Sequence, residues 1–342
     1  MKILVVAPSW VGDMTMAQSL FKKCRSDWPG AVIDVVAPEW SLPLLCRMAE
    51  IRNAVALPVG HGQLRFFKRL TVGRSLQAEG YDWAIITPRT WKSALVPFFA
   101  GIPKRTGYTG ELRFGLLNDR RRLDRAKLDK TILRLLALAQ ERHAPLPPAI
   151  EFYPALTVDR ENQRQLKKAL NLAADRPVVC FCPGAEYGPA KQWPIPFFKR
   201  LAEMLIDAGY QVWALGSAKE VSLGKAIHPG KNRWYHNLCG KTRLEDTIDL
   251  MGCADHVVSN DSGLMHVAAA VNRPLQAIYG SSTPAYTPPL STKARIHYLG
   301  IECSPCFKKK CPYGHYNCLY GIFPEQVYQS IGADHKSGEQ SS

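Results

Sequence analysis

Three short segments of this chain combine residue types that bind anions and move protons. The first, Asn260-Asp-Ser-Gly-Leu-Met-His266, follows the apolar run His256-Val-Val-Ser259 and leads into an Ala-rich segment that predicts a helix. Asp and Ser are favoured N-cap residues, and Gly lets the backbone approach a ligand closely. A helix start directs unpaired N–H groups and the positive end of a dipole at one point, so this turn is a candidate diphosphate site. Strand-to-helix corners of the same composition also occur without a ligand.

The second segment is a glycine-containing loop after another apolar run. Pro177-Val-Val-Cys-Phe-Cys182 predicts a buried strand, and Pro183-Gly-Ala-Glu-Tyr-Gly-Pro-Ala-Lys-Gln-Trp-Pro194 follows it. Its two glycines permit close backbone approach, and Lys191 offers a point charge for phosphate. The Gly-Lys-Ser/Thr ending of a P-loop is missing, and no G-x-G-x-x-G follows a predicted strand. The two loops together therefore predict an anion site of another kind.

The third segment places an acid after the first predicted strand. Lys2-Ile-Leu-Val-Val-Ala7 predicts this strand, and Pro8-Ser-Trp-Val-Gly-Asp13 forms the loop before a helix. Reactive groups of α/β proteins lie at the carboxyl ends of such strands. Asp13 is thus a candidate general base that accepts a proton from a hydroxyl nucleophile, and its competing role is to cap the following helix.

The elements around these segments alternate between strands and helices. Further strands are predicted at 82–87, 211–215, 256–259 and 274–279, and further helices at 126–142, 197–208 and 244–253. Such alternation predicts parallel sheets with helices on both faces. The proline-rich stretch 144–154 is the predicted linker. We therefore expect an α/β protein with domains at 1–150 and 151–332 and a disordered polar tail at 333–342.

The net charge of the chain restricts the kinds of partner that we expect. The formal net charge is +15, and residues 104–130 carry nine Lys or Arg against four acids. A solvated face is one interpretation of such a run, but an anionic membrane surface and an acidic glycolipid also fit it. No nucleic-acid-binding module accompanies the charge. The sequence has neither a signal peptide pattern nor an apolar run of the roughly 20 residues that span a bilayer, which favours a cytoplasmic protein.

Four cysteines cluster near the end of the chain, at Cys303, Cys306, Cys311 and Cys318. Close cysteines in a reducing compartment favour a metal site over disulfides, and four thiolates can hold zinc or an iron–sulfur cluster. The spacing matches neither a zinc ribbon nor the common ferredoxin patterns. The alternatives are a structural metal site and four unmetallated thiols.

The three segments, together with Ser93-Ala-Leu-Val-Pro-Phe-Phe-Ala-Gly-Ile-Pro103, resemble the ADP-heptose:lipopolysaccharide heptosyltransferases of Gram-negative bacteria. The resemblance runs from residue 2 to about 290 with the motifs in the family's order. Members that add the first heptose have a Thr-rich phosphate loop where this chain has Gly184-Ala-Glu186. The chain is therefore more similar to members that add the second heptose.

The resemblance implies a GT-B architecture, with two doubly wound Rossmann-like domains facing across a cleft. It implies an inverting transfer of L-glycero-D-manno-heptose from ADP-heptose onto the first heptose of the lipopolysaccharide inner core. The acceptor would be heptosyl-Kdo2-lipid A, bound by the first domain at the cytoplasmic face of the inner membrane. The second domain would bind the donor. Closure of the domains would assemble the site and exclude water.

The resemblance also implies roles for individual residues. Asp13 would be the general base and Lys191 would stabilise the leaving diphosphate. The expected donor diphosphate and sugar site comprises Gly184, Ala185, Glu186, Asp261, Ser262, Gly263 and His266. Glu220 resembles the acid that binds the adenosine ribose, and its competing role is electrostatic in the first turn of a helix. Basic residues expected to meet the acceptor are Lys104, Arg105, Arg113 and Arg120. No cofactor is expected for catalysis, since Lys191 and helix dipoles replace a divalent metal.

Three alternatives remain at this point. One is a heptosyltransferase with another core acceptor, because acceptor choice resides in loops such as 101–118. A second is a non-catalytic protein that binds sugar nucleotides or lipopolysaccharide, against which the intact Asp13 and Lys191 argue. The third is a metal–thiolate redox or regulatory protein built on the four cysteines.

Overall fold

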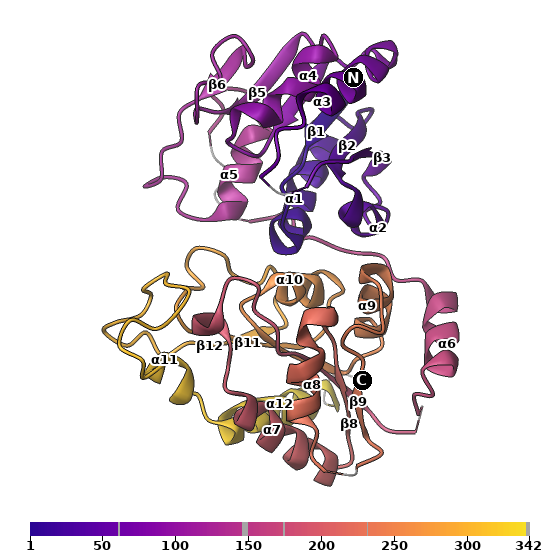
Figure 1. Cartoon of the computed structure of the whole chain (residues 1–342), viewed down its shortest axis with the longest axis vertical. Coiled ribbons are helices and arrows are strands. Elements are labelled where there is room, and N and C mark those ends of the chain that lie inside the picture. Colours follow the sequence, from indigo (N-terminus) through magenta and orange to yellow (C-terminus); the bar gives the residue numbers. More distant parts are fainter. Residues whose placement is uncertain (61, 146–149, 174, 231, 340–342) are drawn as a thin grey trace. The chain divides into compact units, whose positions relative to one another are not determined.

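A computed structural model describes residues 1–60, 62–145, 150–173, 175–230 and 232–339 of the chain, and for 333–339 only the backbone. The chain divides into two compact units, Met1–Ala155 and Leu156–Ser342 (Figure 1). Part of the predicted linker, residues 146–149, lies outside the described residues. Among the described residues, no helix is both long enough and apolar enough to cross a membrane.

The first unit is built on a six-stranded parallel sheet in the order β3-β2-β1-β4-β5-β6. Its strands are β1 (Lys2–Val6), β2 (Val32–Pro38), β3 (Ile51–Leu57), β4 (Trp83–Ile86), β5 (Lys104–Tyr108) and β6 (Asp119–Arg121). Its helices are α1 (Val11–Asp27), η1 (Glu39–Ser41), α2 (Leu42–Leu45), α3 (Phe66–Ser75), η2 (Gln77–Glu79), η3 (Trp91–Ala94), α4 (Leu95–Phe99) and α5 (Thr131–Leu138).

The second unit repeats this plan with the strand order β12-β11-β10-β7-β8-β9, again entirely parallel. Its strands are β7 (Val178–Cys182), β8 (Gln211–Ala214), β9 (Tyr235–Asn237), β10 (His256–Asn260), β11 (Leu275–Ile278) and β12 (Ala294–His297). Its helices are α6 (Arg160–Ala169), η4 (Pro189–Lys191), α7 (Ile195–Asp207), η5 (Ala218–Glu220), α8 (Val221–Ile227), α9 (Leu244–Met251), α10 (Gly263–Ala270), α11 (Asn317–Tyr320) and α12 (Pro324–Glu339).

The central strands are buried because helices cover both faces of each sheet. Every residue of β7 and β10 is buried, as are the last four residues of β1. The core of the second unit includes Phe181 and Phe198, and the indole of Trp193 packs on Phe198 with ring centroids 4.9 Å apart. Short, mainly apolar runs without alternation therefore predicted β1, β7 and β10 correctly.

The strand orders determine where loops converge. In the first sheet, successive strands are added outward from β1 on one side and outward from β4 on the other. In the second sheet, they are added outward from β7 on one side and from β10 on the other. Loops that leave the carboxyl ends of the two strands at such a switch point diverge and leave a crevice between them. Asp13 follows β1, the Lys191 loop follows β7, and Asp261 follows β10. All three predicted loops therefore leave at switch points.

One predicted helix, and the segment predicted as a disordered polar tail, differ from the observed structure. The helix predicted at 126–142 is confined to α5, because residues 124–130 form turns in which Asp124 accepts the backbone N–H of Ala126. Helix α12 continues to Glu339, into the polar segment 333–342, whose last three residues lie outside the described residues.

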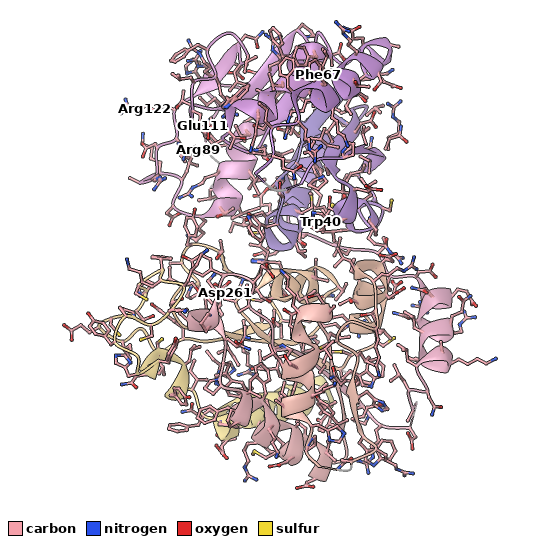
Figure 2. The ribbon with its side chains drawn as sticks, in the orientation of Figure 1. Trp40, Phe67, Arg89, Glu111, Arg122 and Asp261 are labelled. Carbon is pink, nitrogen blue, oxygen red and sulfur yellow. The ribbon has the colours of Figure 1, made fainter. Side chains whose placement is uncertain are left out.

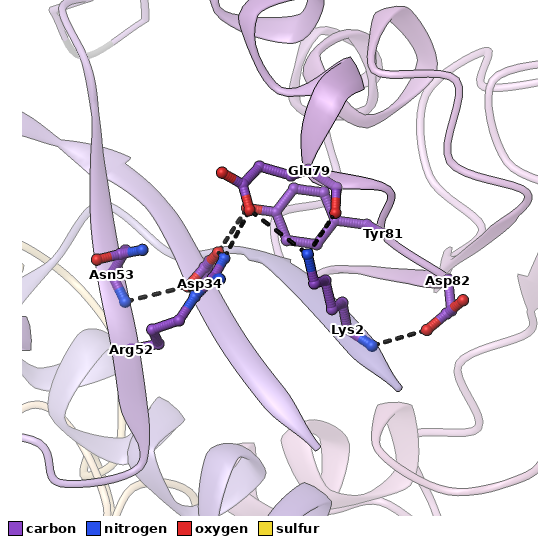
Figure 3. A network of polar contacts seen from close by, with 7 residues as sticks. All are labelled: Lys2, Asp34, Arg52, Asn53, Glu79, Tyr81 and Asp82. Atoms are coloured by element: carbon purple, nitrogen blue, oxygen red, sulfur yellow. Dashed lines mark hydrogen bonds and ion pairs between the residues drawn. The ribbon is translucent and has the colours of Figure 1, made fainter. Parts of the chain in front are cut away.

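A polar network joins strands β1, β2 and β3 of the first unit to residues 79–82, which precede β4 (Figure 3). The buried carboxylate of Asp34 on β2 accepts hydrogen bonds from the Arg52 guanidinium, from the backbone N–H of Asn53 at 3.0 Å and from the Tyr81 hydroxyl at 2.6 Å. Arg52 also donates to Glu79 at 2.8 Å. Burial alone would raise the pKa of the Asp34 carboxyl, but the hydrogen bonds from Arg52 and Tyr81 outweigh it and hold that pKa below its ordinary value.

We predict that Asp34→Ala lowers the free energy of unfolding by about 3 kcal/mol, because it leaves the Arg52 and Tyr81 donors without their buried acceptor. Glu161→Ala is the control, since both side chains of the Glu161–Arg164 pair are exposed and the pair should contribute less than about 1 kcal/mol. Urea unfolding at neutral pH measures both losses.

The same variant should show a defined pH dependence. A carboxyl whose pKa is depressed in the folded state contributes stability above its unfolded pKa of about 3.9 and loses it as the pH falls through the folded pKa. The stability difference between wild type and Asp34→Ala should therefore shrink below about pH 4. A difference that stays constant down to the acid transition would contradict this assignment.

Candidate anion site at the carboxyl ends of β7 and β10

The turn from β10 to α10 forms one wall of the site. Ser262 is the N-cap residue of α10, and its side chain makes no capping hydrogen bond, so the first turn of this helix has no side-chain acceptor at its N-cap. Gly263 begins the helix, and Asp261 lies just before the cap with 5% of its surface exposed. The competing role predicted for Asp261, the N-cap, therefore belongs to Ser262. This geometry presents backbone donors where an anion can bind.

The turn and the Lys191 loop meet in an ion pair. The Lys191 ammonium donates to Asp261 Oδ2 at 2.5 Å, and the Ser282 hydroxyl donates to the same carboxylate oxygen. The Asp261 side chain is almost fully buried, whereas that of Lys191 retains 19% exposure. The carboxylate thus holds a partly accessible ammonium in place, beside the first turn of α10. Asp261 is labelled in Figure 2 within the second unit.

Asn260 connects both loops from the end of β10. Its side-chain amide donates to the Pro183 carbonyl at 2.8 Å and the Gly184 carbonyl at 3.4 Å, and its oxygen accepts the Trp193 backbone N–H at 3.0 Å. Asn260 is fully buried. One amide therefore fixes the beginning and the end of the loop that carries Lys191.

Glu220 lies against the glycine at the start of this loop. A Cβ at Gly184 would meet the Glu220 Cγ at 2.8 Å, so the two residues are in close contact. Glu220 Oε2 accepts from the backbone N–H and the hydroxyl of Ser217, which completes a capping box at the start of η5. Glu220 thus caps the start of η5, a structural role in the first turn of a helix, and its side chain lies beside the predicted site.

The other predicted loop residues have separate surroundings. Ala185 accepts the backbone N–H of Gly188 at 3.1 Å, which closes a turn, and Gly188 has a positive φ of 148°. A side chain at Gly188 would collide with the Lys309 carbonyl at 2.6 Å. Glu186 is exposed and forms an ion pair with Lys219 at 2.7 Å.

His266 is buried on α10 behind the ion pair. Burial lowers its pKa to about 4, and the opposing charge of Asp261 does not offset this. The imidazole is therefore neutral at physiological pH, and its Nδ1 is buried without a hydrogen-bond partner in the structure. His266 lies within electrostatic reach of Asp261 and Lys191, but it packs inward.

Segment 280–309 supports the Lys191 loop from outside. Ala190 donates its N–H to the Lys309 carbonyl at 3.1 Å and accepts from the Ser281 N–H at 3.0 Å. The Tyr187 hydroxyl donates to the Phe307 carbonyl at 2.7 Å. The loop is thus connected by backbone hydrogen bonds to a part of the chain more than 90 residues away.

The cysteines of this supporting segment do not form a recognisable metal site. The charges of Cys303, Cys306 and Cys311 contribute to the raised pKa of the Cys318 thiol after the larger effect of burial, so the four lie in one region. Within the described part of the chain, however, no group of three or more His, Cys, Asp or Glu side chains is arranged to hold a metal ion. Cys318 is buried in the core of the second unit. The predicted zinc or iron–sulfur site is therefore unsupported.

Asp13 lies in the first unit, in the first turn of α1 after β1. Trp10 occupies the N-cap position of α1, so the competing N-cap role of Asp13 is wrong. The neighbouring strand end is close by, because Thr87 donates its N–H to the Val6 carbonyl at 3.1 Å. Asp13 therefore follows the carboxyl end of β1, as its sequence position predicted, and the strand order makes this end part of the switch point between β1 and β4.

The four basic residues expected to meet an acceptor are not gathered at this switch point. Lys104 begins β5, at the amino edge of the sheet, with its ammonium 4.2 Å from the Trp83 ring centre. Arg105 donates to the carbonyls of residues 102 and 116. Arg113 is buried and donates to the Pro88 and Tyr108 carbonyls. Arg120 on β6 stacks on Phe114, 4.9 Å from the ring centre.

Two residues of the anion site received no role from the sequence. Asn260 belongs to the quoted motif, and its position directly before Asp261 was a usable signal. Ser282 follows β11 in Gly280-Ser-Ser, and this small polar turn after an apolar strand also marks a loop at the carboxyl edge. Their contacts with Pro183 and Asp261 depend on strand order, which the motifs do not reveal.

Comparisons with known proteins identify a family model and relatives that this chain resembles. The family model "Glycosyltransferase family 9 (heptosyltransferase)" matches residues 69–317. The chain is 45% identical to lipopolysaccharide heptosyltransferase 2 of Escherichia coli K12 over 97% of this chain and 98% of that protein. It is 44% identical to lipooligosaccharide heptosyltransferase 2 of Haemophilus influenzae, with the same coverage.

A solved structure is similar over the whole length. The structure of E. coli ADP-heptose LPS heptosyltransferase II covers 99% of this chain and 100% of its own, with 42% identity and a TM-score of 0.87. The predicted GT-B class, two doubly wound α/β units, is confirmed by this similarity and by the two parallel sheets.

We predict that Asn260→Ala weakens binding of inorganic pyrophosphate about tenfold, because it releases both ends of the Lys191 loop. Calorimetric titration measures this affinity. The matched control is Asn237→Ala, which removes a comparable amide bridge between the Val221 carbonyl and the Cys239 N–H in the same unit. Equal losses of pyrophosphate affinity in both variants would show that Asn260 acts only on general stability.

Proposed function

The chain belongs to glycosyltransferase family 9, the heptosyltransferases, and we propose that it transfers L-glycero-D-manno-heptose from ADP-heptose to the first heptose of the lipopolysaccharide inner core. The observation that carries this proposal is the Lys191–Asp261 pair beside the start of α10, between two loops of a switch point. The high identity to heptosyltransferases 2 over nearly the full length supports the choice of acceptor.

The second unit would hold the donor at these loops. The Lys191 ammonium and the N–H groups at Ser262 and Gly263 would stabilise the negative charge that develops on the leaving diphosphate. The backbone of Gly184 and Ala185 would line the diphosphate subsite, with Glu220 filling the space beside the Gly184 Cα. Asp261 would accept hydrogen bonds from heptose hydroxyls while it positions Lys191.

The remaining donor contacts would involve three further residues around the same crevice. Glu220 lies against Gly184 and would bind the adenosine ribose through Oε1, since both of its capping bonds use Oε2. Glu186 would contact the donor from the exposed side of the loop. The neutral His266 would shape the pocket behind the diphosphate without adding charge.

Asp13 would act as general base in a single displacement. Its carboxylate would take the proton of the acceptor hydroxyl as that oxygen attacks the anomeric carbon. The bond between the anomeric carbon and the diphosphate oxygen would break, ADP would leave, and the configuration would invert. The position of Asp13 after β1, at a switch point of the first unit, supports this role.

We also propose that the transfer needs no metal or other cofactor, because Lys191 and the α10 dipole supply the positive charge that a divalent cation would supply. The setting would be the cytoplasmic face of the inner membrane, where a lipid-anchored acceptor is available. The net charge of +15 supports association with that anionic surface. In this proposal the first unit binds the acceptor, and its basic residues include Lys104, Arg105, Arg113 and Arg120. The side chains of Arg105 and Arg113 donate to backbone carbonyls, whereas those of Lys104 and Arg120 contact aromatic rings.

One prediction of the proposed function concerns the acceptor. With ADP-heptose as donor, the protein should release ADP in the presence of mono-heptosylated Kdo2-lipid A and not with Kdo2-lipid A. Mass spectrometry should show one added heptose. Transfer to the unheptosylated acceptor would show a heptosyltransferase that adds the first heptose and not the second. No ADP release with either acceptor would favour a non-catalytic binding protein.

The second prediction concerns the two proposed catalytic residues. Lys191→Ala should lower kcat about 100- to 1,000-fold, and Asp13→Asn about 100- to 10,000-fold. Lys199→Ala, on an exposed lysine of the same unit, and Asp27→Asn, on the same helix as Asp13, are matched controls and should retain nearly full activity. Circular dichroism must show all four variants folded. Activity of Asp13→Asn close to wild type would exclude Asp13 as the base.

The third prediction concerns the proposed independence from metals. Exhaustive dialysis against a chelator, followed by assay in chelator, should leave the rate of ADP release unchanged. A rate that falls and is restored by added Mg²⁺ or Mn²⁺ would contradict the proposed role of Lys191.

A further inference from the structure

The first unit exposes large apolar side chains on neighbouring segments. Phe67, on the first turn of α3, has 78% of its surface exposed, and Leu112 and Phe114, in the loop after β5, have 82% and 72%. Leu64, Phe66 and Phe98 are also exposed. Single exposed apolar side chains are ordinary, but a contiguous group marks an interaction surface.

Aromatic and cation–π contacts join these side chains into one face. Ring contacts run from Phe67 to Phe66, from Phe66 to Phe99 and from Phe99 to Phe98, with centroids 5.5 to 5.7 Å apart. The Arg105 guanidinium stacks on Phe98 and donates to the carbonyl of Leu116, in the loop that carries Phe114. The aromatic row on α3 and α4 is thus continuous with the loop after β5.

Three loops that leave the carboxyl ends of β3, β4 and β5 are tied together beneath this face. Lys92 donates to the Gly62 carbonyl, the Trp91 N–H donates to the Glu111 carboxylate at 2.9 Å, and Arg89 donates to the Thr109 carbonyl at 3.3 Å. These bonds link the loops after β3, β4 and β5 into one rim. Figure 2 labels Phe67, Arg89 and Glu111 in this unit.

Two buried arginines hold the exposed side chains outward. Arg69 is 5% exposed and donates to the carbonyls of Leu64 at 2.6 Å and Gln63 at 3.2 Å. Arg113 is 2% exposed and fixes the loop between Leu112 and Phe114 through the carbonyls of Pro88 and Tyr108. The backbone next to the exposed apolar side chains is therefore fixed by these hydrogen bonds.

The charge around this face is mainly positive, although Glu111 belongs to the same rim. Segments 57–78 and 83–110 contain eight Lys or Arg and no Asp or Glu. Among these, Arg65, Lys68 and Arg89 are exposed next to the apolar side chains. Exposed aromatic side chains with basic neighbours match the interface of an anionic bilayer, where rings enter the headgroup region and cations meet lipid phosphates. A protein partner with an apolar surface would not require this excess of basic residues.

We propose that this basic aromatic face, formed by Leu64, Phe66, Phe67, Phe98, Leu112 and Phe114 with Arg65, Lys68 and Arg89, docks the first unit on an anionic phospholipid bilayer. The inference rests on the proposed function in one respect, since a lipid-anchored acceptor would be met at such a bilayer. The loop after β4 within this rim is adjacent to the end of β1, because Thr87 bonds to Val6, and β1 leads to Asp13. Docking would therefore bring the Asp13 edge of the sheet near the lipid headgroups.

The test is sedimentation of the full chain with vesicles of phosphatidylcholine alone and of phosphatidylcholine mixed with phosphatidylglycerol. Wild type should bind the mixed vesicles, and added salt should weaken this binding. Phe67→Ser should weaken it about tenfold or more, and Lys68→Gln about fivefold. The matched controls are Phe323→Ser and Lys199→Gln, on exposed residues of the second unit, which should bind as wild type does.

A second readout separates docking from the chemistry. With a deacylated, water-soluble form of the mono-heptosylated acceptor, Phe67→Ser and Lys68→Gln should transfer heptose at the wild-type rate. Loss of transfer with this soluble acceptor would mean that the face binds the acceptor sugar, which overturns the proposal. Failure of all proteins to transfer heptose would refute the proposed function while the vesicle result stands on its own.

Three further results would also overturn the bilayer proposal. These are an absence of wild-type binding to either vesicle, equal binding by wild type and Phe67→Ser, and a change of oligomeric state in Phe67→Ser on size-exclusion chromatography. The last would assign the face to a second copy of the chain.

Discussion

The ion pair between Lys191 and Asp261 is the interaction on which the candidate site depends. It exists because β7 and β10 are neighbours at the switch point of the second sheet, so that loops 70 residues apart in sequence leave side by side. The buried carboxylate needs the ammonium, and the ammonium is held where a leaving diphosphate would need it. Stability and proposed catalysis thus share one contact, and the helix start at Ser262 adds backbone donors beside it.

This pair is positioned by groups with no part in the chemistry. Asn260 holds both ends of the Lys191 loop, and the backbone of 281–309 supports its middle. The segment that carries the clustered cysteines therefore has a structural role, because the carbonyls of Phe307 and Lys309 accept hydrogen bonds from the loop. The first unit uses the same principle, since buried Arg69 and Arg113 hold loops through backbone carbonyls.

The sequence predicted the parts that depend on local chemistry. Apolar runs identified β1, β7 and β10, and Gly, Asp and Ser at their ends identified the loops, because backbone approach and helix capping are local requirements. It did not predict which side chains pair across loops, such as Ser282 with Asp261, because strand order decides this. Basic composition likewise did not reveal that Arg113 is buried, since burial depends on tertiary packing. Cysteine spacing overstated the case for a metal for the same reason.

The most direct test of the proposed site compares the affinities of ADP and adenosine for wild type and for Lys191→Ala by calorimetry. If Lys191 binds the diphosphate, wild type should prefer ADP strongly, and the substitution should reduce that preference by about tenfold or more with adenosine affinity unchanged. An unchanged ratio of the two affinities would contradict this role, because the crevice between β7 and β10 would then not bind the diphosphate through Lys191.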